Sequence, residues 1–477
     1  MQDYPKLSAS SIVEGLKKRE FSAVEICREA LEAARNKGKG LNAFITIAED
    51  KALRQAAVID QKIEKGVEPG PISGVPIAIK DNICYKDYPT SCASHILDGF
   101  ISPYDATCVK RLLDSGGIII AKTNMDEFAM GSSNENSFYG PALNPVGENL
   151  VPGGSSGGSA AAVSAGIVPI ALGSDTGGSV RQPAAFCGIL GLKPTYGTVS
   201  RYGLVAFASS MDQIGPFARN SQDLALAYSV ICGRDENDST SAEQSYLQNL
   251  RLLEADREFK IGLPKEYYSE ELDSDISRMI DRAVERLGRD GHNFVEVSLP
   301  HSPLAIAAYY VIADAEASSN LARFDGIRFG LRERDDELTA MYCRTRNRGF
   351  GREVKRRIIL GTYVLSAGYY EAYYNKASQV RELICRDFED VFDDVDLLLT
   401  PTTPAAAFKL GEKINDPLAM YLSDIFTVPA NLAGIPAISI PFGVTGDNRP
   451  IGLQFMAPAF KEFSLFQIAG RFEHLMS

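Results

Sequence analysis

The stretch that most constrains the fold runs through residues 172–180 and reads Leu-Gly-Ser-Asp-Thr-Gly-Gly-Ser-Val. The apolar run at 166–172 predicts a buried strand that leads into it. Two glycines, Gly177 and Gly178, precede Ser179 and allow a sharp turn that aims several backbone N–H groups at one point. Such a turn can stabilise an oxyanion, so Ser179 is a candidate nucleophile. The same residues would also fit a tight turn with a capping serine.

Two further stretches place polar residues in apolar surroundings. Residues 152–159, Pro-Gly-Gly-Ser-Ser-Gly-Gly-Ser, run into an alanine-rich segment and predict a loop that leads into a helix. Residues 74–82 predict an apolar strand that carries Lys80 at its end. A lysine in that position is unusual, because burial disfavours the charged ammonium.

One lysine and two serines in such loops suggest a Ser–Ser–Lys proton relay. A serine hydroxyl is a poor nucleophile until a base removes its proton. Lys80 can act as that base only if its pKa falls from about 10.4 toward about 7, which burial and hydrogen bonds to serines can produce.

Together these stretches resemble the amidase signature family. The resemblance rests on Lys80, on the Gly-Gly-Ser-Ser-Gly-Gly-Ser run at 153–159 and on Gly-Ser-Asp-Thr-Gly-Gly-Ser-Val-Arg-Gln-Pro-Ala at 173–184. It continues through residues 186–197, Phe-Cys-Gly-Ile-Leu-Gly-Leu-Lys-Pro-Thr-Tyr-Gly.

The resemblance implies a role for each residue of the relay. Lys80 is expected to be the base, Ser155 the bridging serine with a cis peptide bond to Gly154, and Ser179 the nucleophile. Ser155, rather than Ser156, matches by its position in the run. The expected oxyanion hole consists of Thr176, Gly177 and Gly178.

The resemblance also implies an α/β architecture, the amidase-signature fold. In it a large mixed β-sheet core is covered by helices on both faces. Length alone would allow about three domains. Because no linker-like stretch divides the chain, one domain over residues 1–477 is expected, with a helical N-terminal segment to about residue 70.

Four longer stretches resemble one branch of that family, the A subunits of glutamyl-tRNA(Gln) amidotransferases. They are residues 123–131, 316–330, 353–361 and 421–434. The resemblance covers nearly the whole chain and implies that the protein releases ammonia from glutamine. A partner subunit then uses ATP and Mg²⁺ to amidate Glu-tRNA(Gln), and a third, small subunit completes a heterotrimer. This chain itself is expected to need no cofactor or metal, and tRNA is expected to be bound mainly by the partner.

Glutamine carries an α-carboxylate and an α-ammonium, so its site should offer an arginine and an aspartate. The resemblance assigns these positions to Arg357 and Asp424, with Tyr309 beside them. The match could slip by one residue, to Arg356 or Tyr310.

Residues 153–157 also satisfy Gly-x-Ser-x-Gly, the nucleophile elbow of α/β-hydrolases. That fold needs a strand directly before the serine and a histidine base, but residues 149–152 make a poor strand. The four histidines are better interpreted as surface or packing residues: His95, His292, His301 and His474. No Gly-Lys-Ser/Thr follows the glycines, which disfavours a phosphate-binding loop.

Two classes of function remain open, a subunit of an ammonia-transferring complex and a free-standing amidase for small carboxylic amides. A non-catalytic binding module is disfavoured because Lys80, Ser155 and Ser179 are all present.

The net charge and the cysteine spacing limit which partners, metal sites and cell compartment are expected for this protein. The formal net charge of −12 argues against binding nucleic acid by this chain alone, because such binding depends on phosphate neutralisation by Lys and Arg. The eight cysteines include no Cys-x-x-Cys pair, so neither a zinc site nor a disulfide framework is indicated. No signal-peptide core or membrane-spanning run is found, and the cytoplasm or another reducing compartment is expected.

Several local features are also expected. Ser22 and Glu25 form a capping box, and Gly38 would end the helical segment. Asp126 and Glu127 are interpreted as structural polar groups. Seven basic residues at 342–357 are mostly a solvated face. Residues 234–257 would form a surface excursion, and residues 358–392 a long helical region.

Overall fold

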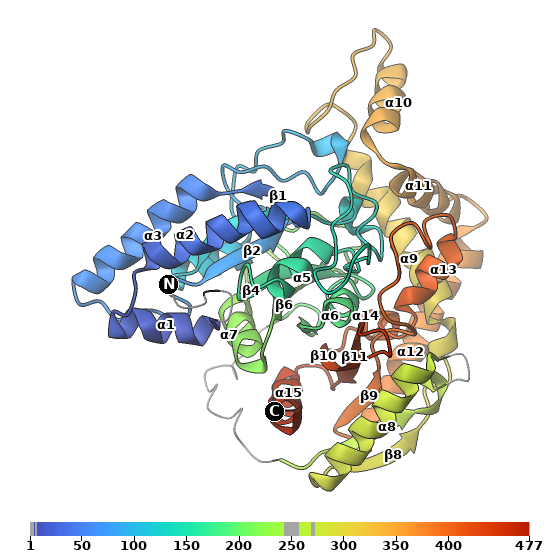
Figure 1. The fold of residues 1–477 in the computed structure, drawn as a ribbon. Coiled ribbons are helices and arrows are strands. Elements are labelled where there is room, and N and C mark those ends of the chain that lie inside the picture. The colour runs from blue at the N-terminus through green and yellow to red at the C-terminus, as the bar shows by residue number, and fades with distance from the viewer. Residues whose placement is uncertain (1–3, 5–6, 243–256, 269–271, 477) are drawn as a thin grey trace.

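The computed structural model describes Tyr4 and residues 7–242, 257–268 and 272–476 of the chain. Within these residues, eleven strands form one sheet (Figure 1). They are β1 (Phe44–Ile47), β2 (Pro76–Lys80), β3 (Ile118–Thr123), β4 (Ile170–Asp175), β5 (Leu190–Lys193), β6 (Gln213–Ala218), β7 (Lys260–Pro264), β8 (Asn293–Val297), β9 (Leu397–Pro401), β10 (Ala437–Val444) and β11 (Pro450–Met456). Their spatial order is β1-β3-β2-β4-β6-β5-β10-β11-β9-β7-β8.

The sheet is mixed. Strand β2 runs parallel to β3 and β4, and β7 runs parallel to β8 and β9. The strands between these groups pair antiparallel. The expected α/β class with a large mixed sheet is therefore confirmed.

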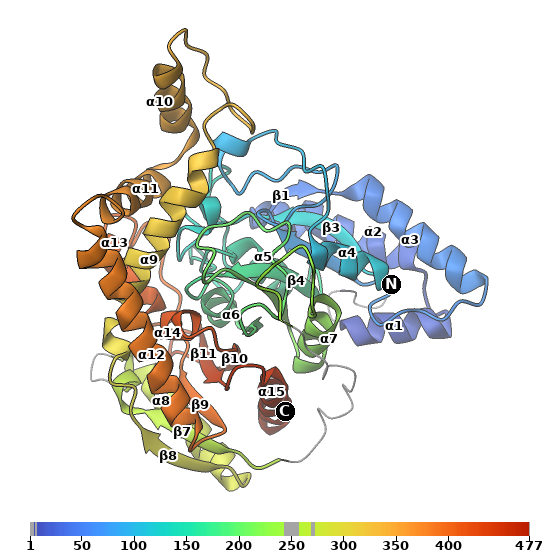
Figure 2. The same cartoon turned by 180° about the vertical axis from the view of Figure 1, so that it is seen from behind.

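Helices lie on both faces of the sheet, as the two opposite views show (Figures 1 and 2). The α-helices are α1 (Ala9–Lys18), α2 (Ala23–Ala33), α3 (Glu49–Glu64), α4 (Thr107–Asp114), α5 (Gly157–Ser164), α6 (Arg181–Cys187), α7 (Ser221–Ile231), α8 (Ser274–Arg289), α9 (Ala305–Asn320), α10 (Leu338–Gly349), α11 (Arg352–Val364), α12 (Lys376–Phe392), α13 (Pro417–Tyr421), α14 (Val428–Leu432) and α15 (Glu462–Met476). No helix in the described part of the chain is long and apolar enough to cross a membrane.

The helices on both faces of the sheet explain the apolar composition of the central strands. Strand β2 reads Pro-Ile-Ala-Ile-Lys and β3 reads Ile-Ile-Ile-Ala-Lys-Thr, and every residue of both is buried. A strand covered on both faces has no solvent side, so its residues need not alternate between apolar and polar. Both strands nevertheless bury a lysine near the carboxyl end, which requires polar partners at that edge.

The N-terminal helices match the sequence except at one glycine. The Ser22–Glu25 capping box is present at the start of α2. Gly38 does not end the helical segment, because a π-helical turn (Ala34–Gly38) continues α2 and residues 39 and 40 are helical as well. Its lack of a side chain has another reason: a Cβ there would come within 2.5 Å of the Phe44 ring.

Two other boundaries differ from the prediction. The strand before Ser179 spans Ile170–Asp175 rather than beginning at residue 166. The helical region at 358–392 is broken after Val364: a π-helical turn (Tyr370–Asn375) precedes α12. Gly368, with φ of +85°, turns the chain between them. Most of the predicted surface excursion, residues 243–256, lies outside the described residues.

Candidate active site

Lys80 lies at the end of β2, between β3 and β4, and is fully buried. Its Nζ donates hydrogen bonds to the hydroxyls of Ser155 at 2.7 Å, Ser156 at 2.8 Å and Ser174 at 3.0 Å. Burial lowers the pKa of Lys80 to about 7, although the carboxylates of Asp126, Asp175 and Asp212 oppose the shift. The lysine can therefore lose its proton near neutral pH, as the relay requires.

The loop before α5 brings two serines to this lysine, and their hydrogen bonds differ. The Ser156 hydroxyl also bonds to the carbonyl of Ser174 at 3.2 Å and accepts from its amide at 3.3 Å. Among the described residues, Lys80 is the sole hydrogen-bond partner of the Ser155 hydroxyl. The Ser155 hydroxyl can thus form a further hydrogen bond besides the one to Lys80, which favours Ser155 as the bridge. Its peptide bond with Gly154 is cis, as expected.

Ser179 follows β4 at the start of α6 and is 8% exposed. Its hydroxyl has no hydrogen-bond partner within the described part of the chain. The turn before it requires glycine, because Gly178 has φ of +144° and a Cβ there would meet Thr427 Oγ1 at 2.2 Å. Ser179 can therefore present a free hydroxyl from a turn that other residues fit poorly.

The amides of this turn are used unequally. The Gly178 N–H, one of the three expected oxyanion donors, is instead bonded to Asp175 Oδ1 at 2.9 Å. The structure gives the amides of Thr176, Gly177 and Ser179 no acceptor among the described residues. These amides are the ones that remain available to a carbonyl oxygen.

A buried ion pair that the sequence analysis did not identify holds the turn. Asp175 and Arg181 are fully buried and 3.0 Å apart. Burial alone would raise the pKa of Asp175, but the Arg181 charge and hydrogen bonds outweigh burial and lower that pKa to about 2. Arg181 also donates to the Thr427 carbonyl at 2.9 Å. In the sequence, this ion pair is indicated by the acidic and the basic residue that flank the Gly-Gly-Ser run.

The three expected substrate residues come from later elements: Tyr309 from α9, Arg357 from α11 and Asp424 from a 3₁₀ turn (Leu422–Asp424). Two of them contact the nucleophile turn. A Cβ on Gly177 would lie 2.7 Å from the Tyr309 hydroxyl, and one on Gly178 would lie 3.3 Å from Asp424 Oδ1.

Arg357 is buried, with its guanidinium 5.1 Å from the ring centre of Tyr310 and 5.4 Å from that of Tyr421. Its Nε donates to Glu353 Oε1 at 2.8 Å. Its terminal nitrogens have no hydrogen-bond partner among the described residues. Arg356 instead pairs with the other Glu353 oxygen at 2.6 Å and is 31% exposed. The geometry thus favours Arg357 over Arg356 as a ligand-binding residue.

Asp424 is the complementary acid. Its Oδ2 accepts from the Ser132 hydroxyl at 2.5 Å, whereas Oδ1 is buried without a partner in the described chain. Burial raises the pKa of Asp424 to about 7, against the lowering effect of the Ser132 hydrogen bond. A buried carboxylate oxygen without a partner is costly unless a ligand cation pairs with it.

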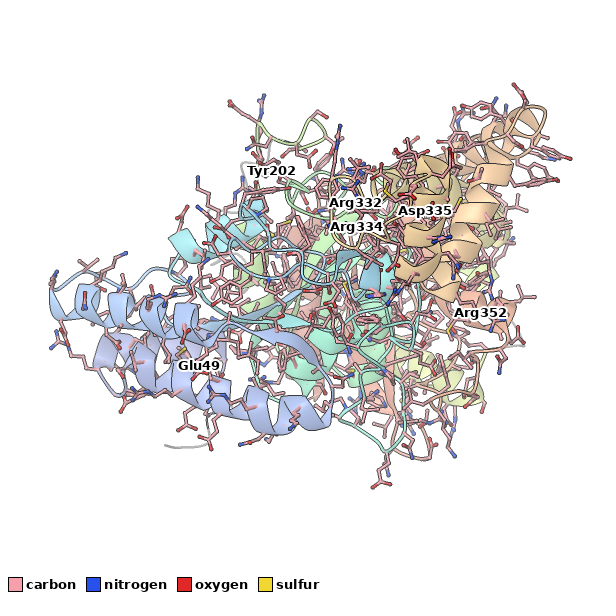
Figure 3. The ribbon with its side chains drawn as sticks, turned by 90° about the horizontal axis from the view of Figure 1, so that it is seen from above. Glu49, Tyr202, Arg332, Arg334, Asp335 and Arg352 are labelled. Atoms are coloured by element: carbon pink, nitrogen blue, oxygen red, sulfur yellow. The ribbon has the colours of Figure 1, made fainter. Side chains whose placement is uncertain are left out.

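A cavity of about 240 Å³ opens beside Arg357, with Glu353, Lys413 and Tyr421 in its wall. The predicted solvated face is confirmed for Arg344, Arg348 and Arg352, which are exposed, whereas Arg346, Lys355 and Arg356 are half-buried and Arg357 is buried. Figure 3 shows Arg352 at the periphery of the molecule.

Asp126 and Glu127 are structural, as predicted. Asp126 accepts from the amides of Asn134 at 2.9 Å and Asn136 at 3.0 Å. Glu127 accepts from the Gly351 amide and the Ser94 hydroxyl. The two acids therefore stabilise separate loops and do not converge.

The histidines do not supply the base that a nucleophile elbow needs. His95 stacks on Phe138, His292 stacks on Phe259, and His301 bonds to Asp387. His474 lies in α15, which packs on α7 and β10. None of these contacts reaches Ser155 or Ser179. Across the described ranges, no cluster of three or more His, Cys, Asp or Glu could hold a metal.

Comparison with known proteins places this geometry in a family. The Amidase family model matches residues 25–466. The glutamyl-tRNA(Gln) amidotransferase A subunit of Carboxydothermus hydrogenoformans is 54% identical over 469 residues, covering 98% of this chain and 96% of that protein.

Solved structures agree. The glutamyl-tRNA(Gln) amidotransferase A subunit from Thermotoga maritima superposes with a TM-score of 0.82 at 44% identity, covering 98% of this chain and 94% of that one. The native peptide amidase of Stenotrophomonas maltophilia gives a TM-score of 0.83 at 29% identity, with 99% and 97% covered. The chain therefore belongs to the amidase family and, within it, to the glutamyl-tRNA(Gln) amidotransferase A subunits.

Proposed function

We propose that this chain is the glutaminase subunit of a tRNA-dependent amidotransferase and supplies ammonia for the conversion of Glu-tRNA(Gln) to Gln-tRNA(Gln). One observation carries the proposal. The Lys80–Ser155 relay contacts Ser174 of β4, the strand that leads into the Ser179 turn, and Asp424, whose Oδ1 has no partner among the described residues, lies against Gly178 of that turn.

Neutral Lys80 accepts the Ser155 proton while Ser155 accepts the proton of Ser179. The Ser179 oxygen attacks the side-chain carboxamide carbon of glutamine. The negative charge then develops on the carbonyl oxygen, where the amides of Thr176 and Gly177 can donate. Collapse of the tetrahedral intermediate breaks the C–N bond, and the relay returns a proton to the departing nitrogen, so ammonia leaves. Water then hydrolyses the acyl-serine ester to glutamate by the same route.

Recognition depends on the two charged groups at the α-carbon of glutamine. The terminal nitrogens of Arg357 bind the α-carboxylate, and Asp424 Oδ1 pairs with the α-ammonium. Tyr309 lies against Gly177, two positions before the nucleophile. The ligand thereby gives Asp424 Oδ1 the partner that it lacks.

The remaining parts of the reaction belong to other subunits in this proposal. Relatives bear the name of one lettered component of an amidotransferase, which supports a complex with further subunits. We infer a heterotrimer in which a partner binds ATP and Mg²⁺ and makes most of the tRNA contacts. The net charge of −12 on this chain supports that division. This chain would act in the cytoplasm, as one domain and without a cofactor of its own.

A free-standing amidase is the second candidate, and the likeness to a peptide amidase favours it. The two proposals differ in which substrate should bind at Arg357 and Asp424. An amidase for neutral amides does not need a buried arginine with open nitrogens beside a carboxylate without a partner.

Co-expression with candidate partner subunits, followed by purification of the complex, tests the proposed function. The complex should form Gln-tRNA(Gln) from Glu-tRNA(Gln), glutamine and ATP. A chain that purifies alone, hydrolyses neutral amides and leaves glutamine untouched would overturn the proposal in favour of the free-standing amidase.

A further inference from the structure

Gln182 is a buried amide that the mechanism above does not use. It lies in α6, three positions after Ser179, and is fully buried. Both ends of its side chain are hydrogen-bonded to backbone: Oε1 accepts from the Gly154 amide at 2.9 Å, and Nε2 donates to the Ser132 carbonyl at 2.7 Å. Because the Gly154 N–H can only donate and the carbonyl can only accept, these partners fix the orientation of the amide.

One of these hydrogen bonds reaches the segment of the bridging serine, and the other reaches the segment that contacts Asp424. Gly154 is the residue before Ser155, whose hydroxyl bonds to Lys80. Ser132 donates its own hydroxyl to Asp424. A single side chain therefore connects the nucleophile segment, the bridging-serine segment and the segment that holds the acid.

The fit around Gln182 leaves little freedom. A Cβ on Gly153 would lie 2.4 Å from its Oε1 and 2.7 Å from Pro183 Cα, so the bridging-serine loop packs directly on α6. The backbone of Gln182 is fixed as well, since its amide donates to the Gly178 carbonyl at 2.8 Å. Movement of either loop would break a hydrogen bond in a region closed to water.

We propose that Gln182 is a positioning residue that holds Ser155 and Asp424 in register with Ser179, so that catalysis and recognition of the substrate ammonium depend on one side chain. The proposal rests on the proposed function of the site. It assigns Gln182 no contact with the substrate.

The test compares Gln182→Met with Gln213→Met in the purified complex. Gln213 is a close match: it is fully buried on β6, its Oε1 accepts from the Gly197 amide at 2.9 Å, and its Nε2 donates to the Val199 carbonyl at 3.0 Å. Both variants leave a buried N–H and a buried carbonyl without a partner, so both should lower Tm.

Kinetics should separate the two variants. For Gln182→Met, kcat should fall about 100-fold, the loss that a displacement of about 1 Å in a catalytic group can cause. KM for glutamine should rise, while KM for butanamide, which lacks the α-groups, should not change. Gln213→Met should keep wild-type kcat and KM at temperatures where it is folded. Wild-type kinetics in Gln182→Met, or equal kinetic losses in both variants, would overturn the proposal.

Gln182→Glu provides a second readout that does not depend on the Met variant folding. A protonated carboxyl can accept from Gly154 and donate to Ser132, whereas an ionised one cannot donate. Activity relative to wild type should therefore be highest at low pH and fall as pH rises, opposite in direction to the wild-type profile. A pH-independent ratio would contradict the positioning role. If Ser179→Ala keeps its activity, the proposed function has failed; if only the Gln182 variants behave as wild type, this inference alone has failed.

Discussion

The site has a lysine end, around Lys80, and a recognition end, around Arg357 and Asp424. The two ends differ in whether their polar groups have hydrogen-bond partners within the protein. At the lysine end, Nζ of Lys80 has three serine hydroxyls within 3.0 Å. At the recognition end, the terminal nitrogens of Arg357 and Oδ1 of Asp424 have no partner among the described residues. In the proposed function, the protein itself supplies the hydrogen-bond partners of Lys80, whereas the charged groups of glutamine supply the partners of Arg357 and Asp424.

The largest effect should come from the nucleophile. Ser179→Ala should lower glutamine hydrolysis by about 10⁴-fold or more, because no other group replaces the attacking oxygen. The hydroxyl has no hydrogen-bond partner in the described chain, so Tm should be unchanged. Transamidation with added ammonium should survive in the same complex. Near-normal glutaminase activity would remove Ser179 from the mechanism.

A change at the base should cost nearly as much. Lys80→Ala should lower kcat by about 10³-fold, and Lys80→Arg should not restore it because a guanidinium keeps its proton. The wild-type rate should rise with pH through about 7, since burial lowers the pKa of Lys80 to that value and only the neutral amine accepts a proton. As a control, substitution of the four histidines should leave the pH profile in place. A fully active Lys80→Arg enzyme would exclude the lysine as base.

The recognition end should respond more weakly and only to charged substrates. Arg357→Ala should weaken glutamine binding by about 1.5–3 kcal/mol, the typical contribution of a hydrogen bond to a charged group. Asp424→Asn should act similarly on the α-ammonium. Butanamide kinetics should not change in either variant. Arg356→Ala, at the neighbouring half-buried position, is the control. Unchanged glutamine kinetics in both variants would favour the free-standing amidase.

The smallest effect should be on stability without ligand. Burial raises the pKa of Asp424 to about 7, above its value in the unfolded chain, so the folded state prefers the protonated acid. Stability from this group is therefore present at low pH and is lost as pH rises toward about 7. Asp424→Asn should raise Tm modestly at about pH 8 and not at about pH 4, measured by thermal unfolding of the complex without glutamine. Equal Tm shifts at both pH values would contradict this account.

Sequence patterns alone identified the candidate catalytic residues but not the contacts that hold them. Lys80, Ser155 and Ser179 all belong to long motifs that contain glycine at fixed positions. The capture of the Gly178 amide by Asp175 was not predicted, because a hydrogen bond inside a turn leaves no trace in residue order. The contact between Tyr309 and Gly177 joins positions more than a hundred residues apart, and only the fold brings them together.

The fold shows the same limit. Strand β2, a continuous apolar run, was predicted within residues 74–82, close to its bounds of Pro76–Lys80. Strand β6 reads Gln-Ile-Gly-Pro-Phe-Ala, and its internal glycine and proline argue against a central strand. In the structure, Pro216 nevertheless lies within β6 opposite Leu172 of β4, whereas the pairing with β5 involves only Phe217 and Ala218.

The strand order also has a consequence for how the chain is made. The first six strands in space, β1-β3-β2-β4-β6-β5, all come from residues 44–218 and are adjacent, so this half-sheet can form while later segments are still being translated. The edge strand of this half-sheet is then β5, and its partner β10 lies more than two hundred residues downstream. Open edges invite pairing with other chains. Strand β5 has only four residues and ends in Lys193, features that restrain such pairing. Chains that are released from the ribosome before residue 437 has been added should therefore aggregate more readily than complete chains.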